Sequence, residues 1–375
     1  MKIASIEAFP LEYPEPHYKG TLRYITLARV TADDGTAGWG ECISQFPEAA
    51  LATATIVERG YAPLLVGADP LDVEALWRTM TDRTWWYGPE GIAAFGLSAV
   101  DMALWDLKGK ALGVPVSRLL GGQLHGEVPA MASIIFDMED TAWTDDEFRW
   151  MRDQGYRIVK GGWGMRPEAV FGQDRAADLA LVERIRTIIG DELELVVDTP
   201  GARALWDVPT AIQRFHDLEP YRLKWIEQPL LPADLAGHAR LRAAVRTAVG
   251  TGEDEWDRES YARLIRSGGV DVVQMDPGRC QGITGCREVI RMVEAEHLYY
   301  SMHTWSSALN TAASVHLMAV SDRGVAMDFK PHESPMQHEL VADPWIQHDG
   351  MLAVRDAPGL GVEVLEETVN RYRFT

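Results

Sequence analysis

From Val128 onward the chain repeats one pattern, in which a short apolar run ends in a polar or charged residue and a helical segment follows. Eight such runs occur over about 200 residues. This alternation is typical of parallel β/α units, and eight units predict closure into a barrel. The alternative, an open doubly wound sheet, is disfavoured because no glycine-rich phosphate loop follows the first run. The runs are Val128–Ile135, Tyr156–Trp163, Leu193–Asp198, Leu223–Gln228, Ala248–Glu253, Val270–Asp276, Leu298–His303 and Val325–Asp328.

The first part of the chain follows a different pattern. Three segments with strand character precede three with helical periodicity, and Gly113 and Pro115 end the last helix. We therefore expect an α+β domain over residues 1–125, the barrel over 126–343, and a C-terminal segment, 344–375, that packs back on the first domain. The expected strands are Lys2–Phe9, Tyr24–Thr31 and Thr36–Ile43, and the expected helices are Pro47–Val66, Leu71–Arg83 and Pro89–Leu112.

The charge balance limits the partners of this protein. The chain has 36 Lys and Arg against 56 Asp and Glu, a formal net charge of −20. Such a balance disfavours nucleic acid and anionic membranes as partners. A small anionic substrate stays possible if a bound cation reverses the sign locally. Neither a leader segment nor a membrane-length apolar run is evident, so we expect a cytoplasmic protein.

Three carboxylates end consecutive apolar runs of the barrel region. Asp198, Glu227 and Glu253 are 29 and 26 residues apart (198 to 227, 227 to 253), about one β/α unit each. The carboxyl ends of barrel strands meet at one face, so these side chains should converge there. A helix cap explains any one of them, but three anions together require a cation. Oxygen ligands with room for water and substrate predict Mg²⁺.

Three further polar residues interrupt the apolar runs. Asp276 and His303 end neighbouring runs, 27 residues apart (276 to 303), and an Asp that fixes an imidazole tautomer makes the other ring nitrogen a general acid–base. Lys160 interrupts the second run, where it would lie opposite the carboxylates and stabilise negative charge on a substrate. A lysine that reaches the surface is the alternative. The other nine histidines, including His332 in a loop, lack such a partner in the pattern.

Several motifs resemble those of the enolase superfamily, particularly its mandelate racemase and acid-sugar dehydratase branch. The segment Ala99–Pro115, followed by Leu119-Leu120-Gly121-Gly122, is similar to the family's domain-junction helix. Three barrel motifs also match: Trp225-Ile226-Glu227-Gln228-Pro229, Gly252-Glu253-Asp254 and Gly282-Ile283-Thr284-Gly285. Together they cover almost the whole chain.

The resemblance implies a fold and a set of site residues. The fold would be a modified (β/α)₇β barrel whose N-terminal α+β domain caps the active site. Mg²⁺ would be held by Asp198, Glu227 and Glu253, and His303 and Asp276 would form a catalytic dyad. Asp328 falls where the family usually has a Glu that binds the substrate carboxylate. Cap regions near His17–Arg23 and Gln45–Phe46 would touch the distal end of the substrate, and the family often forms symmetric homo-oligomers.

Two departures from the family pattern shape the functional expectation. Family racemases carry Lys-x-Lys on the second strand, but Gly162 takes the second position here, and Pro200 stands where Asn often follows the first metal ligand. Racemisation needs bases on both faces, so we expect a single-faced reaction: dehydration of a sugar acid, an aldonate or aldarate, to a 2-keto-3-deoxy acid. A racemase or epimerase with Lys160 as opposing base, a cycloisomerase, and a barrel that binds without chemistry are the alternatives.

Overall fold

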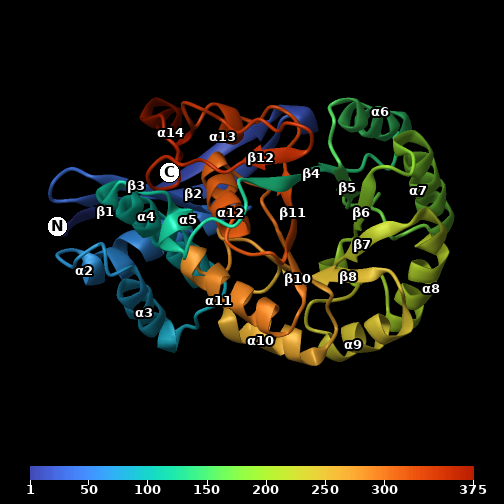
Figure 1. The fold of residues 1–375 in the computed structure, drawn as a ribbon, viewed down its shortest axis with the longest axis horizontal. Coiled ribbons are helices and arrows are strands. Elements are labelled where there is room, and N and C mark those ends of the chain that lie inside the picture. Colours follow the sequence, from blue (N-terminus) through green and yellow to red (C-terminus); the bar gives the residue numbers. More distant parts are fainter.

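The computed structural model describes residues 1–375 apart from the side chain of Ala202, and its central feature is a closed barrel of eight parallel strands (Figure 1). Each strand pairs with the next along the chain, and β11 pairs with β4 to close the ring. The predicted barrel is confirmed, and the open-sheet alternative is wrong. The strands are β4 (Glu127–Ile135), β5 (Ile158–Gly162), β6 (Glu194–Asp198), β7 (Leu223–Glu227), β8 (Ala248–Thr251), β9 (Val272–Met275), β10 (Tyr299–Met302) and β11 (Gly324–Phe329).

Helices connect successive strands and surround the barrel, as Figure 1 shows for α6 to α11. Their apolar faces cover the outer side of the sheet, which explains why strands such as β5 are buried throughout. The connecting helices are α6 (Thr141–Asp153), α7 (Arg175–Ile189), α8 (Val208–Leu218), α9 (Leu235–Ala244), α10 (Arg258–Ser267), α11 (Gly282–Ala295) and α12 (Ala308–Met318). A short helix, α13 (Pro335–His338), follows β11, and β12 (Met351–Ala353) pairs antiparallel with β4.

The N-terminal domain is a three-stranded antiparallel sheet covered by helices. The long helix α4 lies directly on this sheet, because a Cβ on Gly38 or Gly40 would come within 2.2 Å of its backbone carbonyls. The opposite side of α4 meets the barrel, where Asp101 accepts a hydrogen bond from Thr284 Oγ1 at 2.7 Å. The elements are β1 (Ile3–Glu15), β2 (Thr21–Ala32), β3 (Ala37–Cys42), α1 (Pro47–Thr55), α2 (Ala62–Leu65), α3 (Val73–Arg83), α4 (Ile92–Leu112) and α5 (Val116–Leu119); a π-helical segment, Ile56–Tyr61, joins α1 to α2.

The end of the chain returns to the N-terminal sheet. Helix α14 (Glu366–Tyr372) begins at Glu366, which pairs with Arg29 of β2 at 2.7 Å. The backbone N–H of Phe374 donates to the carbonyl of Pro10 at 3.1 Å. In the described part of the chain, no helix combines the length and apolar character that crossing a bilayer requires.

Candidate active site

The three predicted metal ligands converge at the carboxyl ends of β6, β7 and β8. Asp198 and Glu227 are the last residues of β6 and β7 and are direct neighbours in register. Glu253 ends the predicted run Ala248–Glu253 but lies two residues beyond the end of β8. Gly252 has a φ of 127°, which favours glycine, and its carbonyl oxygen accepts from the Glu255 N–H at 2.9 Å in a turn that contains Glu253. One ligand atom from each carboxylate lies within 4.8 Å of the other two.

Lys160 lies among these carboxylates, whereas the sequence placed it opposite them. Its Nζ is 2.7 Å from Glu227 Oε2, 3.0 Å from Asp328 Oδ2 and 3.6 Å from Asp198 Oδ2. The side chain is buried, and burial lowers the pKa of an ammonium group. The surrounding carboxylates more than reverse this and raise the Lys160 pKa well above its ordinary value. Burial of this charge requires such partners, which excludes the surface alternative.

The carboxylate cluster has more acceptors than donors. Asp198 Oδ1 and Glu253 Oε2 are buried without a hydrogen-bond partner, and Asp328 Oδ1 has only an ion pair with Lys160 Nζ, at 3.0 Å. Burial and neighbouring carboxylates raise the pKa of Asp198 well above its ordinary value, and burial raises that of Glu253 to about 7. Orphaned, buried carboxylate oxygens are what a hard divalent cation satisfies, so the donor set fits Mg²⁺.

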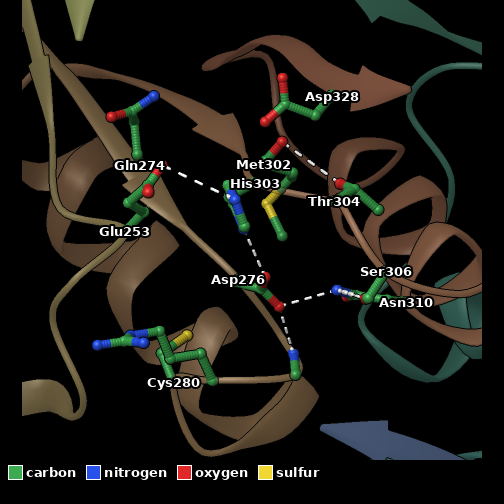
Figure 2. A network of polar contacts seen from close by, with 12 residues as sticks. Glu253, Gln274, Asp276, Cys280, Met302, His303, Thr304, Ser306, Asn310 and Asp328 are labelled. Carbon is green, nitrogen blue, oxygen red and sulfur yellow. Dashed lines mark hydrogen bonds and ion pairs between the residues drawn. The ribbon is translucent and has the colours of Figure 1, made fainter. Parts of the chain in front are cut away.

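His303 and Asp276 form the expected pair, as Figure 2 shows. They follow the last residues of β10 and β9, and His303 Nδ1 lies 2.6 Å from Asp276 Oδ2. The other ring nitrogen, Nε2, lies 3.9 Å from Glu253 Oε2 and therefore faces the carboxylate cluster. Burial lowers the His303 pKa, but Glu253 and Asp276 outweigh it and raise the pKa to about 10.

Residues that sequence reasoning missed hold Asp276 in place. Its Oδ1 accepts from the backbone N–H of Gly278 at 2.7 Å and from Asn310 Nδ2 at 2.9 Å (Figure 2). Asn310 also donates to Ser306 Oγ at 2.9 Å, and Ser306 donates to Glu41 of β3. Burial raises the Glu41 pKa to about 7. The N-terminal domain thus reaches the dyad, and no local pattern announces this contact.

The hydrogen-bond partner of Glu227, Trp225, was also missed, although strand periodicity could have predicted it. Trp225 Nε1 donates to Glu227 Oε1 at 2.8 Å, and side chains two residues apart on a strand share a face. The indole therefore fixes one carboxylate oxygen while Lys160 contacts the other.

Two expected departures from the family pattern have structural counterparts. Gly162 is the register partner of Asp198, and a Cβ at position 162 would lie 2.1 Å from the Asp198 carbonyl oxygen. Position 162, where family racemases have their second lysine, therefore has no space for a side chain in this backbone. Pro200 is followed by a 3₁₀ turn that begins at Gly201.

The cap regions singled out in the sequence differ in their contacts. Residues 17–23 comprise most of the turn between β1 and β2 and the first three residues of β2, and Tyr18 packs against Trp305 with ring centroids 5.5 Å apart. Gln45–Phe46 precedes α1, and Phe46 is exposed.

His332 has an acidic partner from a helix, Glu147, which differs from the neighbouring-strand Asp that the sequence pattern did not offer it. Its ring stacks on His17 with centroids 3.6 Å apart, and the Nε2 atoms of both rings approach Glu147 Oε2 of α6. Loops distant in sequence meet here, which no local pattern shows.

Cavity size does not locate this site. A cavity of about 830 Å³ opens at the opposite end of the barrel, among residues that begin strands, such as Ala248, Val272 and Tyr299. The chemically equipped residues lie instead at the carboxyl ends, under the N-terminal domain.

The fold is a parallel barrel covered by an α+β domain. Its carboxyl-terminal face carries convergent carboxylates, a buried lysine and an Asp–His pair. This combination is typical of barrel enzymes. Residues 143–368 match the family described as "Enolase C-terminal domain-like", and residues 17–121 match "Mandelate racemase / muconate lactonizing enzyme, N-terminal domain". The chain therefore belongs to the enolase superfamily, as its motifs indicated.

Several proteins are similar to this chain over at least 94% of its length. It is 27% identical to a D-galactarolactone cycloisomerase of Agrobacterium fabrum, over 100% of this chain and 99% of the relative. It is 28% identical to a D-galactonate dehydratase of Xanthomonas axonopodis pv. citri, over 94% and 92%. The 3,6-anhydro-D-galactonate cycloisomerase of Zobellia galactanivorans superimposes with a TM-score of 0.90 at 28% identity, covering 100% of both chains. A racemase of Streptomyces coelicolor with bound magnesium gives 0.88 at 27%, covering 99% and 100%.

Proposed function

We propose that this protein is a Mg²⁺-dependent dehydratase of a sugar acid, an aldonate or an aldarate, that forms a 2-keto-3-deoxy acid. The observation that carries this proposal is a single Asp–His pair facing the carboxylate cluster, with no space for a second base at Gly162. A reaction with all proton transfers on one face fits this arrangement better than one that needs two bases.

Asp198, Glu227 and Glu253 would hold the Mg²⁺ ion. The unpaired buried oxygens of Asp198 and Glu253, the convergence of all three carboxylates and a related structure with bound magnesium support this assignment. When bound, the ion supplies Lewis-acid stabilisation of negative charge on the substrate carboxylate. The cluster needs that cation because one lysine balances only part of its charge.

Lys160 and His303 have distinct roles in the proposed reaction. His303 Nε2 removes the proton on the carbon next to the substrate carboxylate, while Asp276 holds Nδ1–H and stabilises the imidazolium. Lys160, fixed among the carboxylates, stabilises the charge that develops on the substrate carboxylate oxygens. Asp328, which anchors Lys160 at 3.0 Å, sets the position of its ammonium group.

The second half of the reaction returns the proton. The β C–O bond breaks with its electron pair on oxygen, and the His303 imidazolium gives its proton to that oxygen, so that water leaves. The enol product then tautomerises to the 2-keto acid. His303 ends the cycle neutral. Loss of water followed by tautomerisation changes no net oxidation state, and no oxidant or reductant is needed.

A cycloisomerase is the second candidate, and two relatives favour it by name. The cycloisomerase reaction would use the same proton transfers, but its leaving oxygen belongs to a ring and stays attached to the product. Racemisation or epimerisation would require Lys160 as the opposing base, but its ammonium group is held in ion pairs with Asp198, Glu227 and Asp328.

The test is a panel of aldonates, aldarates and their lactones, assayed for 2-keto acid formation. We expect one or more acids to react, with activity lost in chelator and restored by Mg²⁺. Conversion of a lactone without release of water would favour the cycloisomerase. Full activity in chelator, or inversion at the α-carbon as the main reaction, would overturn the proposal.

A further inference from the structure

Both donors that hold Asp276 of the proposed dyad are connected to the end of strand β3 in the N-terminal domain. Asp276 Oδ1 accepts from the Gly278 N–H at 2.7 Å and from Asn310 Nδ2 at 2.9 Å (Figure 2). Gly278 is tied to this strand end by its carbonyl oxygen, which accepts from the backbone N–H of Ile43 at 3.3 Å. Ile43 directly follows β3. The other donor, Asn310 of α12, reaches β3 through side chains.

The side-chain route runs from Asn310 through Ser306 to Glu41 of β3. Asn310 Nδ2 donates to Ser306 Oγ at 2.9 Å, and Ser306 Oγ donates to Glu41 Oε1. Ser307 Oγ donates to the other Glu41 oxygen, Oε2. All four residues are buried, so water does not compete for these groups. A continuous chain of hydrogen bonds therefore joins the N-terminal domain to the dyad.

The orientation of the Asn310 amide is the sensitive point of this chain. Its NH₂ group faces both Asp276 Oδ1 and Ser306 Oγ, while its carbonyl oxygen is buried without a hydrogen-bond partner. A buried acceptor without a donor is unfavourable. A half-turn of the amide would bring this oxygen to the Ser306 hydroxyl and satisfy it, but would also turn it against the Asp276 carboxylate.

Glu41 prevents this half-turn by taking the Ser306 proton. A serine hydroxyl has one proton to donate, and an ionised carboxylate only accepts. With its proton on the bond to Glu41, Ser306 presents lone pairs to Asn310 and requires an NH₂ group there. Without Glu41, the Ser306 proton would be free to bond to the unpartnered Asn310 oxygen.

We infer that Glu41 is a positioning residue for the proposed reaction. By holding the Ser306 proton, it keeps the Asn310 amide turned so that it donates to Asp276. Asp276 in turn lies 2.6 Å from His303 Nδ1 and fixes the imidazole. The inference rests on the proposed function, in which His303 removes the proton, and it adds a part for the N-terminal domain.

The alternative is that Glu41 only stabilises helix α12. The backbone N–H groups of Ser307 and Asn310, at the start of this helix, lie 3.4 Å from Glu41 oxygens, and an anion stabilises a helix N-terminus. This role depends on the negative charge of Glu41. Positioning depends only on an acceptor oxygen that faces Ser306, so substitutions can separate the two roles.

The experiment compares Glu41→Leu, which has no acceptor, with Glu41→Gln, which keeps an acceptor oxygen for Ser306 but not the charge. At about pH 8, above the pKa of about 7 to which burial raises the Glu41 carboxyl, the wild-type residue is ionised. We expect Glu41→Leu to lower kcat roughly 10- to 100-fold, as for other residues that orient a reacting group. KM should change less than about twofold, because substrate binding is not affected. Glu41→Gln should keep most of kcat.

A second substitution gives the most specific test. Ser306→Ala removes the hydroxyl that would compete for the Asn310 oxygen, so it should restore most of kcat in the Glu41→Leu protein. Ser307→Ala is the matched control, since it also removes a hydroxyl that donates to Glu41, and it should give no rescue. In Asn310→Leu, which has no amide to turn, Glu41→Leu should cause little further loss of kcat.

A spectroscopic readout does not depend on turnover. The proton between His303 Nδ1 and Asp276 should give a downfield ¹H resonance in the Mg²⁺-loaded protein, identified by its absence in His303→Asn. Glu41→Leu should shift this resonance, and Ser306→Ala should return it toward its wild-type position. A loss of helix stability alone would lower the melting temperature without this paired shift and recovery.

Three outcomes would overturn the inference: wild-type kcat with an unshifted resonance in Glu41→Leu, no rescue by Ser306→Ala, or equal losses of kcat in Glu41→Leu and Glu41→Gln. Glu41→Met serves in place of Glu41→Leu if the latter fails to fold. Absence of α-proton exchange with every acid would instead contradict the proposed function, while the resonance would still decide the role of Glu41.

Discussion

Gly162 and Asp198 face each other across the β5–β6 pair so closely that a Cβ on Gly162 would lie 2.1 Å from the carbonyl oxygen of Asp198 and 2.5 Å from its Cβ. Real Cβ atoms do not approach other atoms within 3.0 Å, so any side chain here displaces Asp198. The position of the proposed metal ligand Asp198 therefore depends on a glycine at position 162.

Gly162→Ala should weaken Mg²⁺ binding and lower kcat/KM by roughly 100-fold, the cost of a displacement near 1 Å at a reacting centre. Gly162→Lys should do the same and should not create a racemase. Calorimetric Mg²⁺ titration and α-proton exchange on both epimers measure these effects. Gly126→Ala is the control, since a Cβ there meets nothing nearer than 3.9 Å. A Gly162→Lys protein with normal Mg²⁺ affinity and racemase activity would refute this account.

Glu227→Gln should abolish Mg²⁺ binding and turnover. One Glu227 oxygen accepts from Trp225 and the other from Lys160, so an amide NH₂ must face a donor. The mismatch should also lower the free energy of unfolding by about 1–3 kcal/mol. Urea denaturation and Mg²⁺ titration test both effects against Glu194→Gln, which removes the same charge at the exposed start of β6. Retained Mg²⁺ affinity would exclude Glu227 as a ligand.

His303→Asn should reduce α-proton exchange with solvent deuterium by about 10²–10⁴-fold, because the proposed base is gone. Asn310→Leu should lower kcat with little change in KM, since Asp276 Oδ1 keeps only its bond from Gly278. His216→Asn, at a half-exposed histidine on α8, should change neither value. Exchange at the wild-type rate in His303→Asn would move the base elsewhere, with Lys160 as the first choice.

The contribution of His316 to the stability of the protein should fall as the pH drops from about 6.5 to about 4. His316 of α12 is buried, its Nε2 lies 3.2 Å from the Leu360 carbonyl oxygen, and burial lowers its pKa from the ordinary 6.5 to about 4. The unfolded chain therefore binds a proton in this window that the folded chain does not, which destabilises the fold as the pH falls. The contribution of this one group is about 3 kcal/mol, at 1.36 kcal/mol per pKa unit.

His316→Gln should make the change of the unfolding free energy between pH 6.5 and pH 4 more favourable to the folded state than in the wild type, by the His316 contribution, because glutamine does not titrate. Urea denaturation at several pH values between 4 and 7 gives the measurement, with His125→Gln, at an exposed histidine, as control. An unchanged slope in His316→Gln would assign the acid sensitivity to other groups.

The sequence alone determined the barrel and the neighbourhood of its chemistry. Apolar runs of strand length alternating with helices leave few packing solutions, and parallel strands bring their carboxyl ends to one face. Asp198 and Glu227 could be assigned to one cluster because each ends such a run, and strand periodicity would also have placed Trp225 on the face of Glu227. These conclusions depend on local periodicity, which a sequence carries directly.

Only the tertiary structure decided contacts between residues that no repeat relates. The turn at Gly252 contains Glu253, Lys160 lies between Glu227 and Asp328, and Glu41 reaches the dyad through Ser306 and Asn310 from another domain. Arg23 likewise meets Trp305, with 4.8 Å from its guanidinium carbon to the ring centroid, because the β1–β2 hairpin packs on the barrel. Such contacts depend on how the N-terminal domain packs over the barrel mouth, and that packing is set by apolar surfaces far from the polar residues they bring together.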